Sequence, residues 1–161
     1  MEEPEYFHEV AAQLDYPMII VTAAADGERS GCLVGFHAQC SIDPLRYLVC
    51  VSTSNHTYRV ASRAEYLAVH FLDQRDYELS LLFGERTGDE TDKFTATAWR
   101  DEHGAPVLTQ TRAWFVGRVQ QRVPFGDHVG HVLEPVAGHV EGPLHQLGFQ
   151  RVKTMEPGHP A

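Results

Sequence analysis

The sequence predicts a mainly β protein with short helices, folded as an antiparallel barrel whose ends the helices cover. About six segments are rich in apolar and β-branched residues, which is typical of strands, and two or three short segments have helical periodicity. Most connections between successive strands are too short for the crossover that a parallel pair requires, so antiparallel strands are expected. With 161 residues, 43% hydrophobic and 22% charged, the chain suits one globular domain over 1–161.

The first predicted element is a short helix over about residues 4–14. Phe7, Val10, Ala11 and Leu14 recur at the spacing of one helical face, and Pro17 follows them. The core of the domain is expected over about 16–141, followed by a tail over about 142–161. Pro, Gly and His are frequent in this tail, so its final dozen residues are expected to be mobile.

The first half of the core is predicted to hold four strands and two helices, separated by turn residues. Asp26-Gly27 supplies a hairpin turn, and Asp43-Pro44 ends the second β run. Ser54 or Asn55 is expected to cap the first of these helices, and Gly84 to end the second. The strands are expected over 18–25, from the turn through Cys40, over 47–52 and over 66–72, and the helices from the cap to about 64 and over 75–83.

The second half of the core is predicted to be dominated by one long hairpin. Residues 88–92 are expected to form an exposed acidic loop, and Gly104-Ala105-Pro106 is expected to interrupt regular secondary structure further on. After this break, residues 113–123 and His128–Val140 are both β-rich, and Phe125-Gly126-Asp127 joins them as a turn.

Composition limits the function and the location of the protein. The formal net charge of -9 repels nucleic acid, so an anionic ligand must be bound by a local pocket of amides, hydroxyls and one or two cations. Cys32, Cys40 and Cys50 are odd in number and form no CxxC pair, which favours buried, reduced thiols. No apolar stretch is long enough for a membrane span, and the acidic N-terminus is unlike a signal peptide. A cytoplasmic protein is expected.

Four short motifs occur at intervals that are similar to those of a known family. They are GCLVGFHAQCSIDP at 31–44, SNHT at 54–57, DKF at 92–94 and GDH at 126–128. In this order, over about residues 16–140, they resemble the flavin reductase-like domains. The resemblance implies a Greek-key-like, FMN-binding split barrel. It also implies a homodimer with flavin sites near the subunit interface, and a monooxygenase partner that receives the reduced flavin.

The first motif is expected to contact the flavin ring. Its glycines let backbone N–H groups approach a planar ring, and Ser41 offers a hydroxyl. In the family an Asn-Ser pair is common where this chain has Gly35-Phe36, so polar contacts to the ring are missing here. The other interpretation is a plain core strand. The cofactor-binding residues predicted in this segment are Leu33, Val34, Gly35, Phe36, Gln39, Cys40 and Ser41.

The second and third motifs are expected to bind the flavin phosphate. A run of polar residues stands at the start of a predicted helix, where free N–H groups favour a phosphate, although a plain helix cap would also explain it. By resemblance Lys93 reaches the phosphate; otherwise it pairs with Asp89, Glu90 or Asp92. The residues predicted to bind cofactor here are Ser52, Ser54, Asn55, His56, Thr57, Lys93 and Phe94.

His128 is the predicted catalytic residue. The resemblance places it near the face where nicotinamide docks, where an imidazole could orient the cofactor amide or deliver a proton. The other interpretation is a hydrogen-bonded histidine at the end of the barrel. No metal site is expected, because His128 and His131 are three residues apart on a strand and so point to opposite faces.

Three hypotheses for the function follow. The first is a flavin reductase that passes hydride from NADH or NADPH to bound FMN or FAD, with the choice within each pair left open. The second, motivated by Gly35 and Phe36, is a flavin, deazaflavin or haem binding protein without reductase activity. The third is a structural or regulatory homologue with an empty pocket. The sequence contains none of the motifs of α/β-hydrolases, P-loop NTPases or Rossmann dinucleotide-binding domains, so these classes are not expected.

Overall fold

Seven strands form one antiparallel sheet in the computed structural model, which describes residues 4–85 and 92–155. Their order across the sheet is β2-β1-β5-β8-β9-β4-β3, and every neighbouring pair is antiparallel. The strands of the sheet are β1 (Ile19–Ala25), β2 (Glu28–Val34), β3 (His37–Ser41), β4 (Arg46–Ser52), β5 (Tyr66–Phe71), β8 (Ala113–Pro124) and β9 (His128–Val140).

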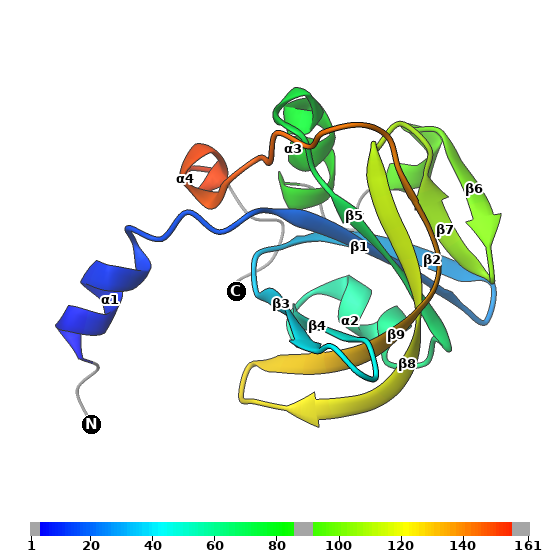
Figure 1. Cartoon of the computed structure of the whole chain (residues 1–161), viewed down its shortest axis with the longest axis horizontal. Coiled ribbons are helices and arrows are strands. Elements are labelled where there is room, and N and C mark those ends of the chain that lie inside the picture. The colour runs from blue at the N-terminus through cyan, green and yellow to red at the C-terminus, as the bar shows by residue number, and fades with distance from the viewer. Residues whose placement is uncertain (1–3, 86–91, 156–161) are drawn as a thin grey trace.

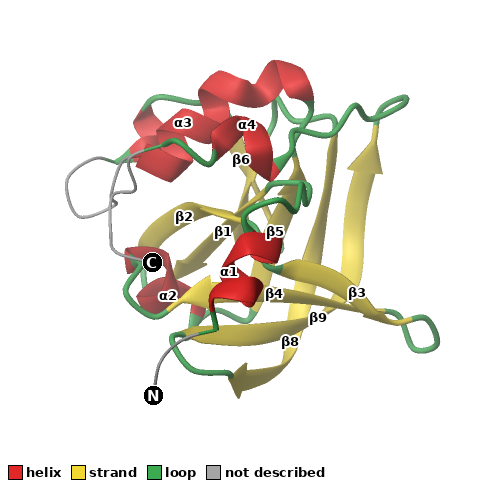
Figure 2. Ribbon diagram, turned by 90° about the vertical axis from the view of Figure 1, so that its left-hand side faces the viewer, coloured by secondary structure: helices red, strands yellow, loops and turns green. Residues whose placement is uncertain are grey.

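The sheet curls on itself because its two edge strands follow one another in the chain. β2 and β3 lie at opposite ends of the strand order, yet only Gly35 and Phe36 separate them in sequence. β2 and β3 are not hydrogen-bonded to each other in the sheet, so it stays open along this seam. Figure 2 shows the resulting curved wall, with α2 at one end. The predicted antiparallel split barrel with short helices is confirmed.

Short helices flank the sheet in the described part of the chain. α3 and α4 lie together along one side, whereas α1 extends away from the body (Figure 1). The helices are α1 (Glu5–Ala11), α2 (His56–Ala61), α3 (Tyr77–Glu85) and α4 (Phe149–Val152), with 3-10 turns η1 (Gln74–Asp76) and η2 (Lys93–Thr95). None of these described helices is long and apolar enough to cross a membrane.

β1 is buried on both faces and separates two apolar clusters. Alternation along the strand directs Ile19 and Val21 into the interior of the curled sheet, beside Leu67 and Leu133. Ile20 faces the other way, into a cluster beneath α3 and α4 that includes Phe83. The buried residues of both clusters are almost completely removed from water. β1 is therefore firmly packed, and it supports the edge strand β2, which pairs with it.

Two predicted turns are present as expected. Asp26 and Gly27 both have positive φ, 52° and 79°, which is the backbone of a two-residue hairpin, and they connect β1 to β2. Residues 125–127 connect β8 to β9, with the Phe125 N–H donating to the His128 carbonyl at 2.9 Å. Local sequence chemistry therefore fixes both connections.

The strand predictions missed one hairpin and one interruption. The run expected to continue through Cys40 is broken at Gly35-Phe36 into β2 and β3. A further hairpin, β6 (Trp99–Glu102) and β7 (Ala105–Leu108), forms where only an interruption of secondary structure was expected. Its turn is His103-Gly104, again with positive φ at both residues. The prediction failed because these strands have only four residues each.

The helix boundaries also differ from the prediction. α1 ends at Ala11 and α2 at Ala61, earlier than expected, although Asn55 does cap α2. α3 continues through Gly84 instead of ending there. A Cβ at Gly84 would lie 2.9 Å from Leu33 Cδ2, so this glycine permits close packing of the helix on β2.

The segment predicted to be a mobile tail is packed against the body as far as residue 155. α4 lies within it, and Leu147 and Val152 are buried in the cluster beneath α3. The expected mobility of the last dozen residues is therefore wrong for 150–155, and 156–161 lie outside the described residues. Most of the expected acidic loop, together with Asp89 and Glu90, also lies outside them.

The three cysteines are free thiols in three different environments. Cys32 is buried, Cys50 is partly buried, and Cys40 is exposed, which corrects the expectation that all three are buried. Burial raises the pKa of the Cys32 thiol to about 11, so this thiol stays protonated and unreactive near neutral pH.

Candidate functional site

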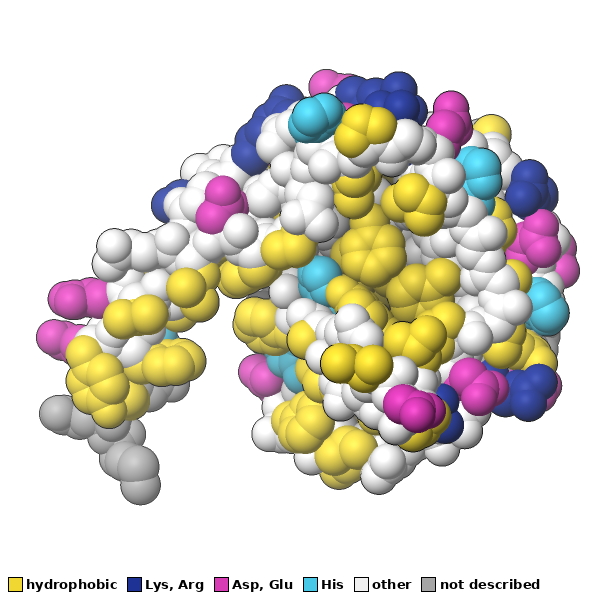
Figure 3. Space-filling view, viewed as in Figure 1, with side chains coloured by type: hydrophobic (Ala, Val, Ile, Leu, Met, Phe, Trp, Pro, Cys, Tyr) yellow, Lys and Arg dark blue, Asp and Glu magenta, His cyan; other side chains and the backbone are white. Residues whose placement is uncertain are grey.

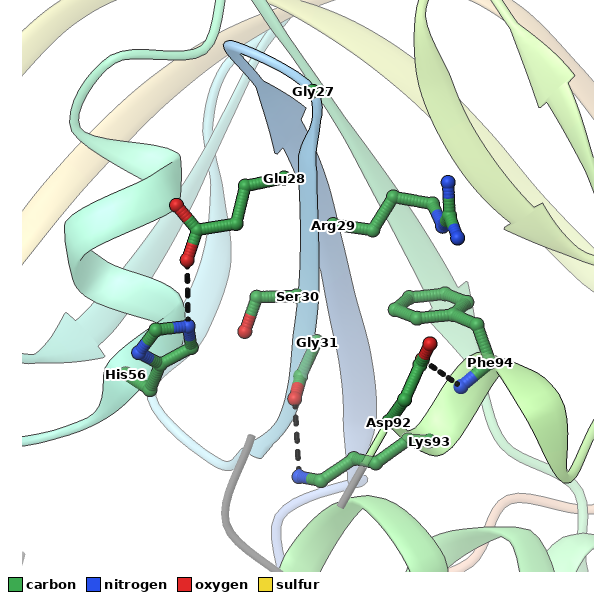
Figure 4. Close-up of a pocket in the computed structure, with 9 residues that line it drawn as sticks. All are labelled: Gly27, Glu28, Arg29, Ser30, Gly31, His56, Asp92, Lys93 and Phe94. Carbon is green, nitrogen blue, oxygen red and sulfur yellow. Dashed lines mark hydrogen bonds and ion pairs between the residues drawn. The ribbon is translucent and has the colours of Figure 1, made fainter. Parts of the chain in front are cut away.

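A pocket of about 250 Å³ lies along the β2 edge of the sheet. β2 crosses the middle of the pocket, α2 borders one side and η2 the other (Figure 4). The lining residues are Gly27, Glu28, Arg29, Ser30, Gly31, His56, Asp92, Lys93 and Phe94. Residues from the first three sequence motifs, the glycine motif, SNHT and DKF, therefore meet at one place.

Strand alternation divides the side chains of β2 between the two sides of the pocket. Glu28 and Ser30 point toward α2, whereas Arg29 points toward Phe94 (Figure 4). The two sides consequently differ in chemistry: hydroxyls and an ion pair face α2, and a cation with aromatic rings faces η2.

The α2 side is a connected polar network. Ser30 Oγ and Thr57 Oγ1 are hydrogen-bonded at 2.8 Å in the interior, and the Thr57 N–H donates to the Asn55 side chain at 2.9 Å. Glu28 pairs with His56 Nε2 at 3.0 Å and accepts from Arg63 at 3.1 Å. The Glu28 carboxylate is thus partly balanced by the Arg63 guanidinium, which reduces its repulsion of an anion in the pocket.

Lys93 is buried at the base of the pocket and does not lie on the surface. Its Nζ donates to the carbonyl oxygens of Phe83 at 3.0 Å and Gly31 at 3.2 Å. Burial lowers the pKa of the ammonium. The predicted exposed ion pair with Asp92 does not form, because Asp92 Oδ1 accepts from the Phe94 N–H at 3.0 Å and Lys93 binds backbone carbonyls.

Arg29 is a pocket residue that the sequence interpretation missed. Its guanidinium carbon lies 4.5 Å from the centroid of the Trp99 ring and 6.0 Å from that of Phe94. The residue itself is exposed at the mouth of the pocket. A signal was present in the sequence, since Arg29 stands two residues before the first glycine of the glycine motif, but nothing showed which way it points.

The predicted catalytic residue His128 lies beside the seam of the sheet. Its ring centroid is 5.0 Å from that of Phe36, and its Nδ1 hydrogen-bonds with Asp127 Oδ1 at 2.7 Å. His128 pairs with Ser52 across β9 and β4, and the Thr53 N–H donates to the Asp127 carbonyl at 2.9 Å. The loop from Ser52 to the Asn55 cap therefore links His128 to the α2 side of the pocket.

The remaining predicted cofactor residues do not line this pocket. Leu33 and Val34 pack into the apolar clusters on the two faces of the sheet. Gln39, Cys40 and Ser41 lie at the far end of β3, where the Gln39 side chain donates to the Ser41 carbonyl at 3.2 Å. A role in cofactor binding for these five residues stays a prediction, as do those of Ser52, Ser54 and Phe36, which lie near His128 and the start of α2.

The described residues contain no group of three or more His, Cys, Asp and Glu side chains that could hold a metal ion. His131, which alternation was expected to separate from His128, is fully buried within β9, whereas His128 is partly exposed.

Comparison with known proteins places this arrangement in a family. The flavin reductase like domain matches residues 11–156. The chain is 29% identical over 154 residues to the stachydrine N-demethylase reductase subunit Stc3 of Rhizobium meliloti, covering 92% of this chain and 64% of that protein. It is 31% identical over 126 residues to the FMN reductase (NADH) RutF of Bradyrhizobium diazoefficiens, covering 78% and 69%. This chain thus spans less than two thirds of the length of the demethylase subunit.

A solved structure has the same fold. The flavin reductase domain protein from Arthrobacter sp. FB24 superimposes with a TM-score of 0.82 at 22% identity, covering 98% of this chain and 95% of that one. The family match extends over most of the chain and includes all four sequence motifs and the whole pocket. The chain belongs to the flavin reductase like domain family.

Proposed function

We propose that this protein is an NAD(P)H-dependent flavin reductase, which transfers hydride from a reduced nicotinamide to FMN or FAD. The observation that carries the proposal is the meeting of three family motifs around one pocket, at Gly31, His56 and Asp92–Phe94. Relatives named as an FMN reductase (NADH) and as a reductase subunit support the same activity.

The residues of the pocket fit a flavin nucleotide. An anionic phosphate needs donors and a cation in a chain of net charge -9, and the pocket offers Arg29 on one side of β2 and the hydroxyl of Ser30 on the other. Since α2 has only six residues and Asn55 already caps the Thr57 N–H, its helix dipole contributes little. A bound flavin supplies the hydride-accepting ring, and the protein supplies binding, alignment and exclusion of water.

Phe36 and His128 are suited to positioning the nicotinamide beside the flavin. Phe36 is exposed, and its aromatic face can cover a planar ring and keep water from it. Asp127 fixes the imidazole of His128 through Nδ1, which leaves Nε2 to hydrogen-bond the nicotinamide amide or to hold a proton. His128 is therefore proposed as the catalytic residue.

The alternative, a flavin, deazaflavin or haem binding protein without reductase activity, is favoured by one specific feature. The ring of Tyr16 packs on Gly35, at the position where an Asn is common in the family, and Phe36 follows it. Aromatic rings thus stand where polar contacts to the flavin are expected, and such a surface suits a less polar ring equally well.

We infer a homodimer in the cytoplasm. No residue of α1 is buried, and apolar side chains lie exposed on the segment that projects from the body (Figure 3). Tyr6, Phe7 and Val10 of α1, together with Leu14 just after the helix, are 50% to 74% exposed. A second copy is the proposed cover. The three free thiols suit a reducing compartment. A monooxygenase is the proposed recipient of reduced flavin, in line with a relative named as a reductase subunit.

The decisive experiment mixes the purified protein anaerobically with FMN or FAD and then with NADH or NADPH, while the visible flavin absorbance is followed. Catalytic bleaching with one preferred pair is the expected result. Retention of a flavin without bleaching would contradict the reductase proposal and support the binding-protein alternative. A protein that binds no flavin would contradict both.

A further inference from the structure

We propose that Arg29 is the residue that binds the phosphate of the flavin nucleotide at the mouth of the pocket. The inference rests on the proposed function for the identity of the ligand. It names a residue to which no sequence motif assigned a role, and it follows from the charges and hydrogen bonds around the pocket.

The other charged groups of the pocket are already engaged. Glu28 is paired with His56 and Arg63, and Asp92 accepts the Phe94 N–H. Lys93 is buried and uses two of its three N–H donors on backbone carbonyls. An incoming phosphate would be repelled by the two carboxylates, and it would have to compete with the Phe83 and Gly31 carbonyls for Lys93.

Arg29 differs from them because its guanidinium makes no hydrogen bond or ion pair within the described part of the chain. Within residues 4–85 and 92–155, the interactions of its side chain are the ring contacts to Trp99 and Phe94. A cation–π contact is made by the positive charge over the ring and does not use the N–H groups as hydrogen-bond donors to oxygen, so these groups can donate to a ligand. Five donors in one plane suit two oxygens of a phosphate at once.

The two rings also hold the cation in place before the ligand arrives. Phe94 is buried, and its ring packs edge-on against Trp99 with centroids 5.9 Å apart, so Arg29 lies on two aromatic rings that are packed against each other. A side chain held in its binding position loses less conformational entropy when the ligand binds. Lysine at position 29 would keep the charge but lose both the stacking and the planar set of donors.

The test compares FMN with riboflavin, which lacks the phosphate and is otherwise the same molecule. Dissociation constants for both are measured by titration with the wild-type protein, Arg29→Ala and Arg29→Lys. The control is Arg100→Ala, because Arg100 also lies over a tryptophan, 5.6 Å from the Trp114 ring centroid, but outside the pocket. The readout is the preference for FMN, expressed as the ratio of the two constants.

We expect Arg29→Ala to reduce the preference for FMN by about 10- to 100-fold, as the loss of a charge-assisted pair predicts, with riboflavin affinity unchanged. Arg29→Lys is expected to lie between Arg29→Ala and the wild type, and Arg100→Ala to match the wild type. The proposal is overturned by an unchanged preference in Arg29→Ala, by equal losses of FMN and riboflavin binding, or by a wild type without preference. Failure of the reductase function is seen separately, as FMN binding without oxidation of NADH or NADPH.

Discussion

The phenol ring of Tyr16 occupies the space that any side chain at position 35 would need. A Cβ built on Gly35 overlaps the Tyr16 ring, and that ring stacks in turn on Phe149 of α4 at 4.6 Å between centroids. Gly35 is therefore required by packing between the entrance to β1 and the seam of the sheet. This relationship gives a structural reason for the departure from the Asn that is common in the family.

Gly35→Ala is expected to destabilise the fold by about 1–3 kcal/mol, the usual cost of overpacking. In the Tyr16→Ala background the same substitution is expected to cost little, because the overlapping ring is gone. Urea unfolding of the four proteins of this double-mutant cycle measures the coupling. An equal cost of Gly35→Ala in both backgrounds would show that Tyr16 does not determine the residue at position 35.

Lys93→Met is expected to lower the free energy of unfolding by about 1–3 kcal/mol, because two buried carbonyl oxygens lose their donor. Lys153→Met is the matched control, since Lys153 is exposed. Equal stability of the two variants in urea unfolding would argue against a structural role for Lys93.

Titration of Lys93→Met with FMN and riboflavin also tests the phosphate contact that resemblance predicts, which would appear as a lost preference for FMN.

Two buried histidines are expected to make the fold sensitive to acid. Burial lowers the pKa of both His70 and His131 to about 4. His70 Nδ1 donates to the Ile20 carbonyl, and its Nε2 accepts the Leu108 N–H, so the neutral ring joins β5 to β1 and β7. Both rings are neutral in the folded and unfolded states above the unfolded pKa of about 6.5, so neither destabilises the fold there.

As the pH falls below about 6.5, the unfolded state binds protons that the folded state rejects, and stability is lost until the folded pKa of about 4 is reached. The limiting slope is about 1.4 kcal/mol per pH unit for each histidine. His131→Leu is expected to remove one of these contributions, because it removes the titrating ring. The substitution sacrifices no hydrogen bond of Nε2, since this atom has no partner among the described residues. Urea unfolding between pH 4 and 7 measures how the free energy of unfolding changes with pH. An unaltered slope in His131→Leu would show that His131 does not contribute to the acid sensitivity.

The apolar face of α1 is expected to hold two copies of the chain together. A seven-residue helix is too short to be stable in water by itself, so it needs a packing partner. Phe7→Asp combined with Val10→Asp should convert a dimer to a monomer in sedimentation velocity, whereas Glu9→Gln on the same helix should not. A monomeric wild type, or a dimer that survives the double substitution, would refute this role.

The parts of the fold that could be predicted depend on local chemistry. Asp26-Gly27 specifies its hairpin by positive φ, and the run of polar residues before Thr57 does contain the cap of α2. The parts that were missed depend on contacts between distant segments. Gly84 was interpreted as a helix end but is a packing residue against Leu33, and Arg29 gained its role only when the β6 strand brought Trp99 beneath it.

His128→Ala is expected to slow flavin reduction by about 100-fold, as the loss of a group that orients the reactants or transfers a proton predicts, while FMN affinity changes little. The reason is position: His128 lies against Phe36 at the seam and contributes nothing to the lining of the pocket. Asp127→Asn keeps a hydrogen-bond acceptor for Nδ1 but removes the charge, so it should slow the reaction less. Stopped-flow absorbance gives the rate of hydride transfer, and flavin fluorescence gives the affinity. If the rate is unchanged, or if FMN affinity falls in parallel with it, His128 acts as part of the fold and takes no part in the reaction.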